Sequence, residues 1–117
     1  MENLNSVLTE ISRQRGIDRS VLIKAIEMSI LKAAQKTFGI NREYVVKYSE
    51  VNEEVELYED MIVVESVQDP EREISLAEVQ KHNLDASVGE ILGFQIFWND
   101  MEKAKEQQKE FGDLLRI

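Results

Sequence analysis

The spacing of apolar residues changes along the chain, and at its start that spacing predicts a helix. In residues 2–13 the apolar positions recur every three or four residues, which is the period of an amphipathic helix. These positions are Leu4, Val7, Leu8 and Ile11. Gly16 follows, and glycine is a common residue just past the end of a helix. The segment therefore predicts a first helix with one buried stripe.

A second helix is predicted between Asp18, a favourable N-cap residue, and Gly39. Its residues divide into two sides on a helical wheel. One broad arc is apolar and is expected to face the core: Leu22, Ile23, Ile26, Ile30, Ala33 and Ala34. The opposite side, which we call the outer face, mixes polar and apolar residues: Lys24, Lys32, Gln35 and Lys36 with Val21, Ala25 and Met28.

Beyond residue 40 the period shortens and predicts strands. Residues 43–50 and 54–60 are expected to form two short strands joined by a turn at 51–53. In the second of these, apolar and charged residues alternate, as in a sheet with one face in water. Residues 61–67 are rich in β-branched residues and predict a third, more buried strand, which Pro70 closes.

The last third of the chain predicts a short helix, a strand and a final helix. Ser75 and Glu78 have the spacing of a capping box, which begins a short helix. Residues 91–98 alternate in the manner of a fourth strand, and Asn99 is a good cap for a helix over the remaining residues.

This order of elements predicts one domain over residues 1–117 with an α+β fold. The expected architecture has two N-terminal helices, a small, largely antiparallel sheet of three to four strands, a short helix and a C-terminal helix. The helices are expected to pack on one face of the sheet.

The net charge of −9 is unevenly distributed. Residues 1–40 contain six basic and four acidic residues, whereas residues 41–80 contain three basic and twelve acidic ones. A strongly acidic chain does not bind nucleic acid or anionic membranes over its whole surface. The basic outer face of the second helix therefore stands apart from the rest of the chain.

The sequence shows little that is typical of an enzyme. It has no cysteine, which excludes disulfides, zinc thiolates and cysteine nucleophiles and fits a reducing, cytoplasmic compartment. His82 is the single histidine, and we expect it to be exposed or to cap a helix. No nucleophile elbow, P-loop or dinucleotide-binding motif occurs. We therefore expect no catalytic residue, metal or cofactor.

One alternative to that expectation is a carboxylate enzyme or a metal protein acting through residues 50–60, where acidic residues are dense. Because these acids alternate along predicted strands, they are expected to spread over a solvated face. The outer face of the second helix also leaves two interpretations open. It is either an ordinary solvated surface or a docking face, since Met28 and Val21 lie among lysines.

Three segments resemble the N-terminal domain family of NusA, a bacterial transcription elongation, termination and antitermination factor: GIDRSVLIKAIEMSILKAAQKTFG at 16–39, MIVVESVQDPEREISLAEVQK at 61–81 and VGE at 88–90. In the first, a run of alanine and aliphatic residues ends in Lys36, Phe38 and Gly39. The later matches are Ile74, Ser75, Leu76, Ala77 and Glu78, then Val88 and Gly89. The resemblance covers about residues 4–96. Residues 99–117 diverge, and they either replace the family's last helix or are inserted before it.

The resemblance implies a non-enzymatic domain that binds RNA polymerase near the RNA exit channel, through the β-subunit flap. It implies roles in pausing, termination and antitermination, with nascent RNA as a weaker partner. In this family the basic end of the second helix can lie close to the RNA hairpin; Lys36 matches that position, and Lys32 lies one turn earlier. With Lys24 and Met28 these are the expected partner-binding residues.

The family also has S1 and KH domains that bind RNA, for which this chain has no room. The alternative function is an autonomous RNA-binding module that uses the same basic helix face.

Overall fold

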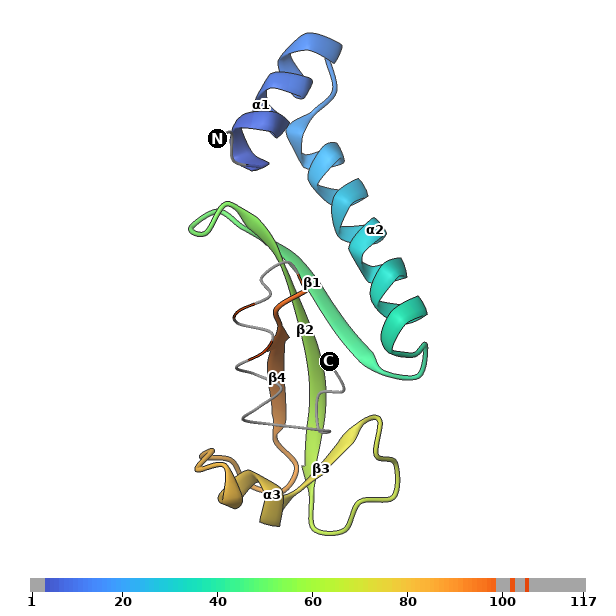
Figure 1. The fold of residues 1–117 in the computed structure, drawn as a ribbon, viewed down its shortest axis with the longest axis vertical. Helices are drawn as coiled ribbons and strands as arrows, with labels where there is room; N and C mark the ends of the chain where they lie inside the picture. Colours follow the sequence, from blue (N-terminus) through green and yellow to red (C-terminus); the bar gives the residue numbers. More distant parts are fainter. Residues whose placement is uncertain (1–3, 99–101, 103–104, 106–117) are drawn as a thin grey trace.

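The computed structural model describes residues 4–98 together with Glu102 and Lys105. Its elements follow one another as α1 (Leu4–Arg15), α2 (Arg19–Phe38), β1 (Glu43–Ser49), β2 (Glu54–Val64), β3 (Glu73–Ser75), α3 (Leu76–Lys81) and β4 (Ile91–Ile96) (Figure 1). The predicted α+β class is confirmed. Of the predicted C-terminal helix, only Glu102 and Lys105 are described, and both are helical; the rest of 99–117 lies outside the described residues.

The sheet is built around β2. Residues 57–60 of β2 pair with β1 and with β4 at the same time, so these two antiparallel neighbours lie on opposite sides of it. The last three residues of β2 pair with β3, and this pairing is parallel. The four strands therefore form a mixed sheet in which antiparallel pairing predominates (Figure 1).

Two strand predictions were wrong. The segments 54–60 and 61–67 form one continuous strand that ends at Val64, well before Pro70. No turn-forming residue separates Asp60 from Met61, and the pairing with β4 runs through both. Strand β3 was not predicted, because three residues are too few to show a period.

The ends of the helices agree with the sequence in most respects. Gly16 has a left-handed φ of 65°, and Gly39 has a φ of 120°; each donates its N–H back to the preceding helical turn. Ser75 caps α3 by accepting the N–H of Glu78 at 3.1 Å. Asp18 precedes α2, but its side chain makes no capping bond. Its carbonyl instead accepts the N–H groups of residues 21 and 22.

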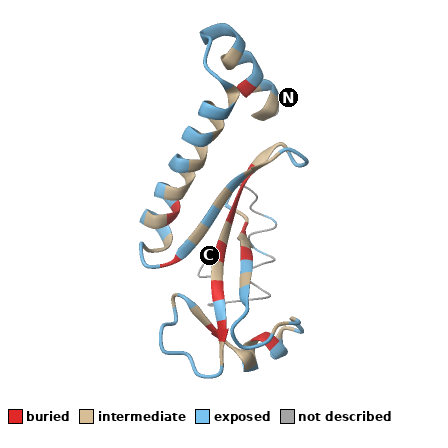
Figure 2. Ribbon diagram, turned by 180° about the vertical axis from the view of Figure 1, so that it is seen from behind, coloured by how far each residue is buried: buried red, intermediate tan, exposed pale blue. Residues whose placement is uncertain are grey.

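The core lies on the face of the sheet that α2 and α3 cover, which we call the inner face. Figure 2 shows the buried residues concentrated along β2. Residues beneath α3 form one cluster: Met61, Val63, Ile74, Val79 and Phe94. Ala34, Leu57 and Ile96 form a second beneath α2, with Ile30 and Phe38 packed against them. Burying a side chain of this size contributes about 1.5–3 kcal/mol.

The predicted core arc of α2 is right except at Ala33, which is exposed. Ala34, its neighbour, is 3% exposed. Successive residues of a helix are rotated by about 100°, so a residue next to the most deeply buried position lies on the flank of the helix. The sheet covers a narrower arc of α2 than the apolar pattern predicts.

Candidate partner-binding face

The four residues predicted to bind a partner lie together on the outer face of α2. Lys24, Met28, Lys32 and Lys36 are each four residues apart, and this spacing places them in one row along a helix. All four are exposed, and Met28 exposes 53% of its surface. Val21, on the same side, exposes 57%. The row faces away from the sheet, in agreement with the wheel.

The three lysines of this row are available to an anionic partner. None of them makes an ion pair with another residue in the described part of the chain. Lys36 lies in the last turn of α2, where a positive charge also stabilises the negative end of the helix dipole. The helix dipole is therefore a structural reason for a lysine at this position.

The first turn of α2 is tied to the rest of the molecule by Arg19. Its guanidinium donates to the Glu50 carboxylate at 3.1 Å, to the Tyr48 hydroxyl at 3.4 Å and to the Asn5 side chain. It also lies 5.3 Å from the centre of the Tyr48 ring, within cation–π range. The hydrogen bond with Glu50 raises the pKa of Arg19. One cation thus connects α1, α2 and the end of β1.

Two further contacts set the rotation of α2 about its axis. The Glu27 carboxylate accepts the backbone N–H of Tyr48 at 2.9 Å. At the other end the Tyr44 hydroxyl donates to the carbonyl of Gly39 at 2.7 Å. Burial, followed by the charge of Glu59, raises the pKa of Tyr44, so its hydroxyl stays protonated as a donor. These bonds hold the outer face toward solvent.

A buried ion pair that the sequence pattern did not predict lies close to the end of α2. The Arg42 guanidinium and the Glu59 carboxylate are paired, and each side chain is 1% exposed. Glu59 occupies an inner-face position between Leu57 and Met61, where the alternation of β2 calls for an apolar residue. A charged residue at an apolar position of the period is the signal that could have revealed the pair.

The acidic residues of 50–60 enter different contacts. Glu56 accepts hydrogen bonds from the Tyr58 hydroxyl and the Asn52 amide, both at 2.8 Å, and these lower its pKa. Glu50 pairs with Arg19, and Glu59 pairs with Arg42. Within 4–98, 102 and 105, no three His, Cys, Asp or Glu side chains are arranged to hold a metal ion.

His82 was expected to be exposed or to cap a helix, and it lies at the C-cap position of α3. Its Nε2 atom is 3.4 Å from Oε2 of Glu78. None of the helices in the described part of the chain has the length and apolar character needed to cross a membrane.

Comparisons with family models and with individual proteins agree on one family. A family model described as the NusA N-terminal domain matches residues 3–111. A protein of Rickettsia conorii is 26% identical over 84 residues, and one of Bacillus subtilis is 24% identical over 104 residues. Both are named transcription termination/antitermination protein NusA. The matches cover 72% and 89% of this chain, respectively.

The fold has a solved counterpart. The solution structure of the N-terminal domain of NusA from B. subtilis superposes with a TM-score of 0.64 at 24% identity, covering 91% of this chain and 92% of that one. The chain corresponds to a small part of the curated relatives: 17% of the R. conorii protein and 28% of the B. subtilis protein.

Proposed function

The chain belongs to the NusA N-terminal domain family, and from that premise we propose that it is a non-enzymatic module that binds RNA polymerase. The proposed docking site on the polymerase is the β-subunit flap beside the RNA exit channel. The proposed output is modulation of pausing, termination and antitermination. Family membership over residues 3–111 is the observation that carries this proposal. The names of the R. conorii and B. subtilis relatives support it.

The outer face of α2 is the proposed docking surface. Met28 and Val21 expose about half of their surface, 53% and 57%, among lysines that carry no intramolecular ion pair in the described residues. A flexible methionine beside an exposed valine within a charged rim suits a protein partner, because the apolar centre supplies affinity and the rim supplies orientation. Lys36 and Lys32, toward the C-terminal end of the row, are the proposed contacts with exiting RNA.

Binding to immobilised core polymerase tests the docking proposal. The chain should bind intact polymerase and lose that binding when the tip of the β flap is deleted. Binding that is unaffected by the deletion would refute the flap assignment. Met28→Asp should weaken binding because it places a charge at the apolar centre of the face. Val88→Asp, at a residue 49% exposed in the loop after α3, is the matched control.

The autonomous RNA-binding alternative makes a different prediction. Filter binding of RNA to the isolated chain should then be detectable at low salt and should fall steeply as salt increases, because counterions are released. The proposed function expects weak or undetectable binding to free RNA, since the whole chain carries a charge of −9. Tight, salt-sensitive binding to RNA alone would favour the alternative.

A further inference from the structure

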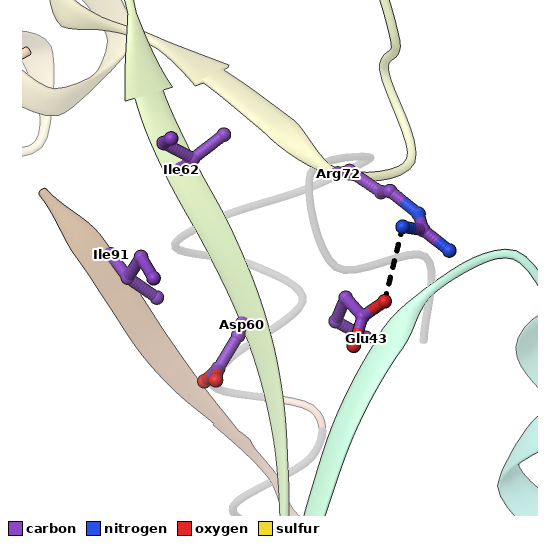
Figure 3. A pocket seen from close by; sticks show the side chains of 5 residues that line it. All are labelled: Glu43, Asp60, Ile62, Arg72 and Ile91. Carbon is purple, nitrogen blue, oxygen red and sulfur yellow. Dashed lines mark ion pairs between the residues drawn. The ribbon is translucent and has the colours of Figure 1, made fainter. Parts of the chain in front are cut away.

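The face of the sheet opposite α2 has a hollow that the proposed function does not use. It is lined by Glu43, Asp60, Ile62, Arg72 and Ile91 (Figure 3), and we call it the Asp60 hollow. Asp60 and Ile62 alternate along β2 with the fully buried Met61 and Val63, so they point away from the inner face. Its volume of about 360 Å³ is at the low end for a ligand site, roughly 300–1,000 Å³.

Two carboxylates meet in this hollow. Glu43 of β1 and Asp60 of β2 are directly opposed in the strand register, an arrangement that destabilises a sheet when the charges are alike. Arg72 compensates one of them: it lies 3.1 Å from the Glu43 carboxylate and is held by a 2.6 Å hydrogen bond to the carbonyl of Asn41. The lining therefore carries two negative charges and one positive charge, and a single cation would balance it.

Asp60 is the carboxylate of this hollow that Arg72 does not compensate. It is half-buried, and in the described part of the chain its side chain makes no ion pair or hydrogen bond. Figure 3 shows its carboxylate on the β4 side of β2, away from the pair between Arg72 and Glu43. Its register partner on β4 is Gly93. A Cβ at Gly93 would come within 3.2 Å of Asp60 Oδ1, so glycine keeps the space beside this carboxylate open.

The wall beside Asp60 is apolar and accessible. Ile62 and Ile91 are register partners on β2 and β4, and they expose 38% and 65% of their surfaces. An apolar wall next to a carboxylate that pairs with no described residue matches a long side chain with an aliphatic stem and a cationic head. Arginine fits best, because its planar guanidinium can bond both oxygens of one carboxylate.

We propose that the Asp60 hollow binds one arginine side chain of a partner protein. The arginine stem packs against Ile91 and Ile62, and the guanidinium pairs with Asp60 over Gly93. This contact lies on the opposite side of the sheet from the outer face of α2. It therefore does not depend on the polymerase proposal and can be tested without polymerase.

The probe is N-acetyl-arginine methylamide, titrated into the isotopically labelled full chain while amide shifts are recorded by NMR. We expect saturable shifts at Asp60, Ile62, Ile91 and Gly93. The citrulline analogue has nearly the same shape without the charge and should give none. Absence of saturable shifts with the arginine probe, or equal shifts with citrulline, would overturn the proposal. Equal binding of the lysine analogue would overturn the assignment to arginine.

Two variants test the residues themselves. Asp60→Asn keeps the shape of the side chain and should weaken binding of the arginine probe at least tenfold, since it removes a charge-assisted pair. Gly93→Ala should weaken it by filling the space beside Asp60. Glu65→Gln, at an exposed glutamate just past β2 and outside the hollow, should bind the probe as the unmodified chain does. Unchanged affinity in Asp60→Asn would refute the site, whatever the other variants show.

Discussion

The guanidinium of Arg42 and the carboxylate of Glu59 form an ion pair in which each side chain is 1% exposed. Arg42 lies in the loop that follows α2, whereas Glu59 lies in the middle of β2. The pair thus joins the end of the proposed docking helix to the central strand. Within the described part of the chain, two nitrogen atoms of Arg42, Nε and Nη2, are buried without a hydrogen-bond partner.

Removing one member of this pair should destabilise the fold strongly. Arg42→Met leaves the Glu59 charge in a buried site, and the expected loss is about 3–5 kcal/mol in free energy of unfolding, measured by urea denaturation. The double variant Arg42→Met/Glu59→Met should recover much of that loss, because it removes both charges of the pair and leaves neither buried without its partner. A single variant that costs less than about 1 kcal/mol would show that the pair is not buried in solution.

Replacing Arg19 should loosen α1 locally without destabilising the whole fold. Arg19→Met keeps the aliphatic stem but removes the bonds to Asn5, Tyr48 and Glu50. Hydrogen exchange of the α1 amides should become faster, while exchange in β2 should be unchanged. Arg15→Met, at an exposed arginine of α1, is the control and should have no such effect. Equal acceleration in α1 and β2 would indicate global destabilisation instead.

Lys36 and Lys81 provide a matched pair of charge reversals. Each is exposed and lies in the last turn of its helix, so Lys36→Glu and Lys81→Glu should each cost about 0.3–1 kcal/mol through the helix dipole. Only Lys36→Glu should weaken hairpin-stabilised pausing in a transcription assay, as the proposed RNA contact requires. Similar pausing with both variants would remove Lys36 from the binding face.

The hydrogen bonds of Glu56 predict a pH dependence. The Tyr58 hydroxyl and the Asn52 amide hold the pKa of Glu56 below its ordinary value of 4.5. Its contribution to stability is therefore fully present above about pH 4.5 and is lost as the pH falls through the lowered pKa. Urea midpoints at pH 6 and pH 3 should differ less in Glu56→Gln than in the unmodified chain. Glu65→Gln is the control, and an identical effect of both variants would contradict the assignment.

The opposed carboxylates Glu43 and Asp60 predict a stabilising substitution. Asp60→Asn relieves the like-charge contact and should raise the free energy of unfolding by roughly 0.2–1 kcal/mol at low salt. The gain should shrink as salt screens the repulsion. A loss of stability at low salt would mean that the Asp60 charge is already compensated within the chain.

The candidate face could be predicted because it depends on one helix. The spacing of Lys24, Met28, Lys32 and Lys36 places them on one side of any regular helix, and the apolar arc indicates which side is outward. The Asp60 hollow could not be predicted. Its residues come from β1, β2, β4 and the loop before β3, and only the strand register brings Glu43, Asp60 and Gly93 into one row.

The sequence by itself determined the helices and most of their ends. The signals for these features are local: the apolar period, the positive-φ positions Gly16 and Gly39, and the Ser75 cap. Each acts within a few residues, so it can be recognised in the sequence. Tertiary structure alone decided that β2 is one long strand, that β3 exists and that Glu59 is buried against Arg42. These features depend on which strands become neighbours and which charges lose water, and both are set by contacts between residues far apart in sequence.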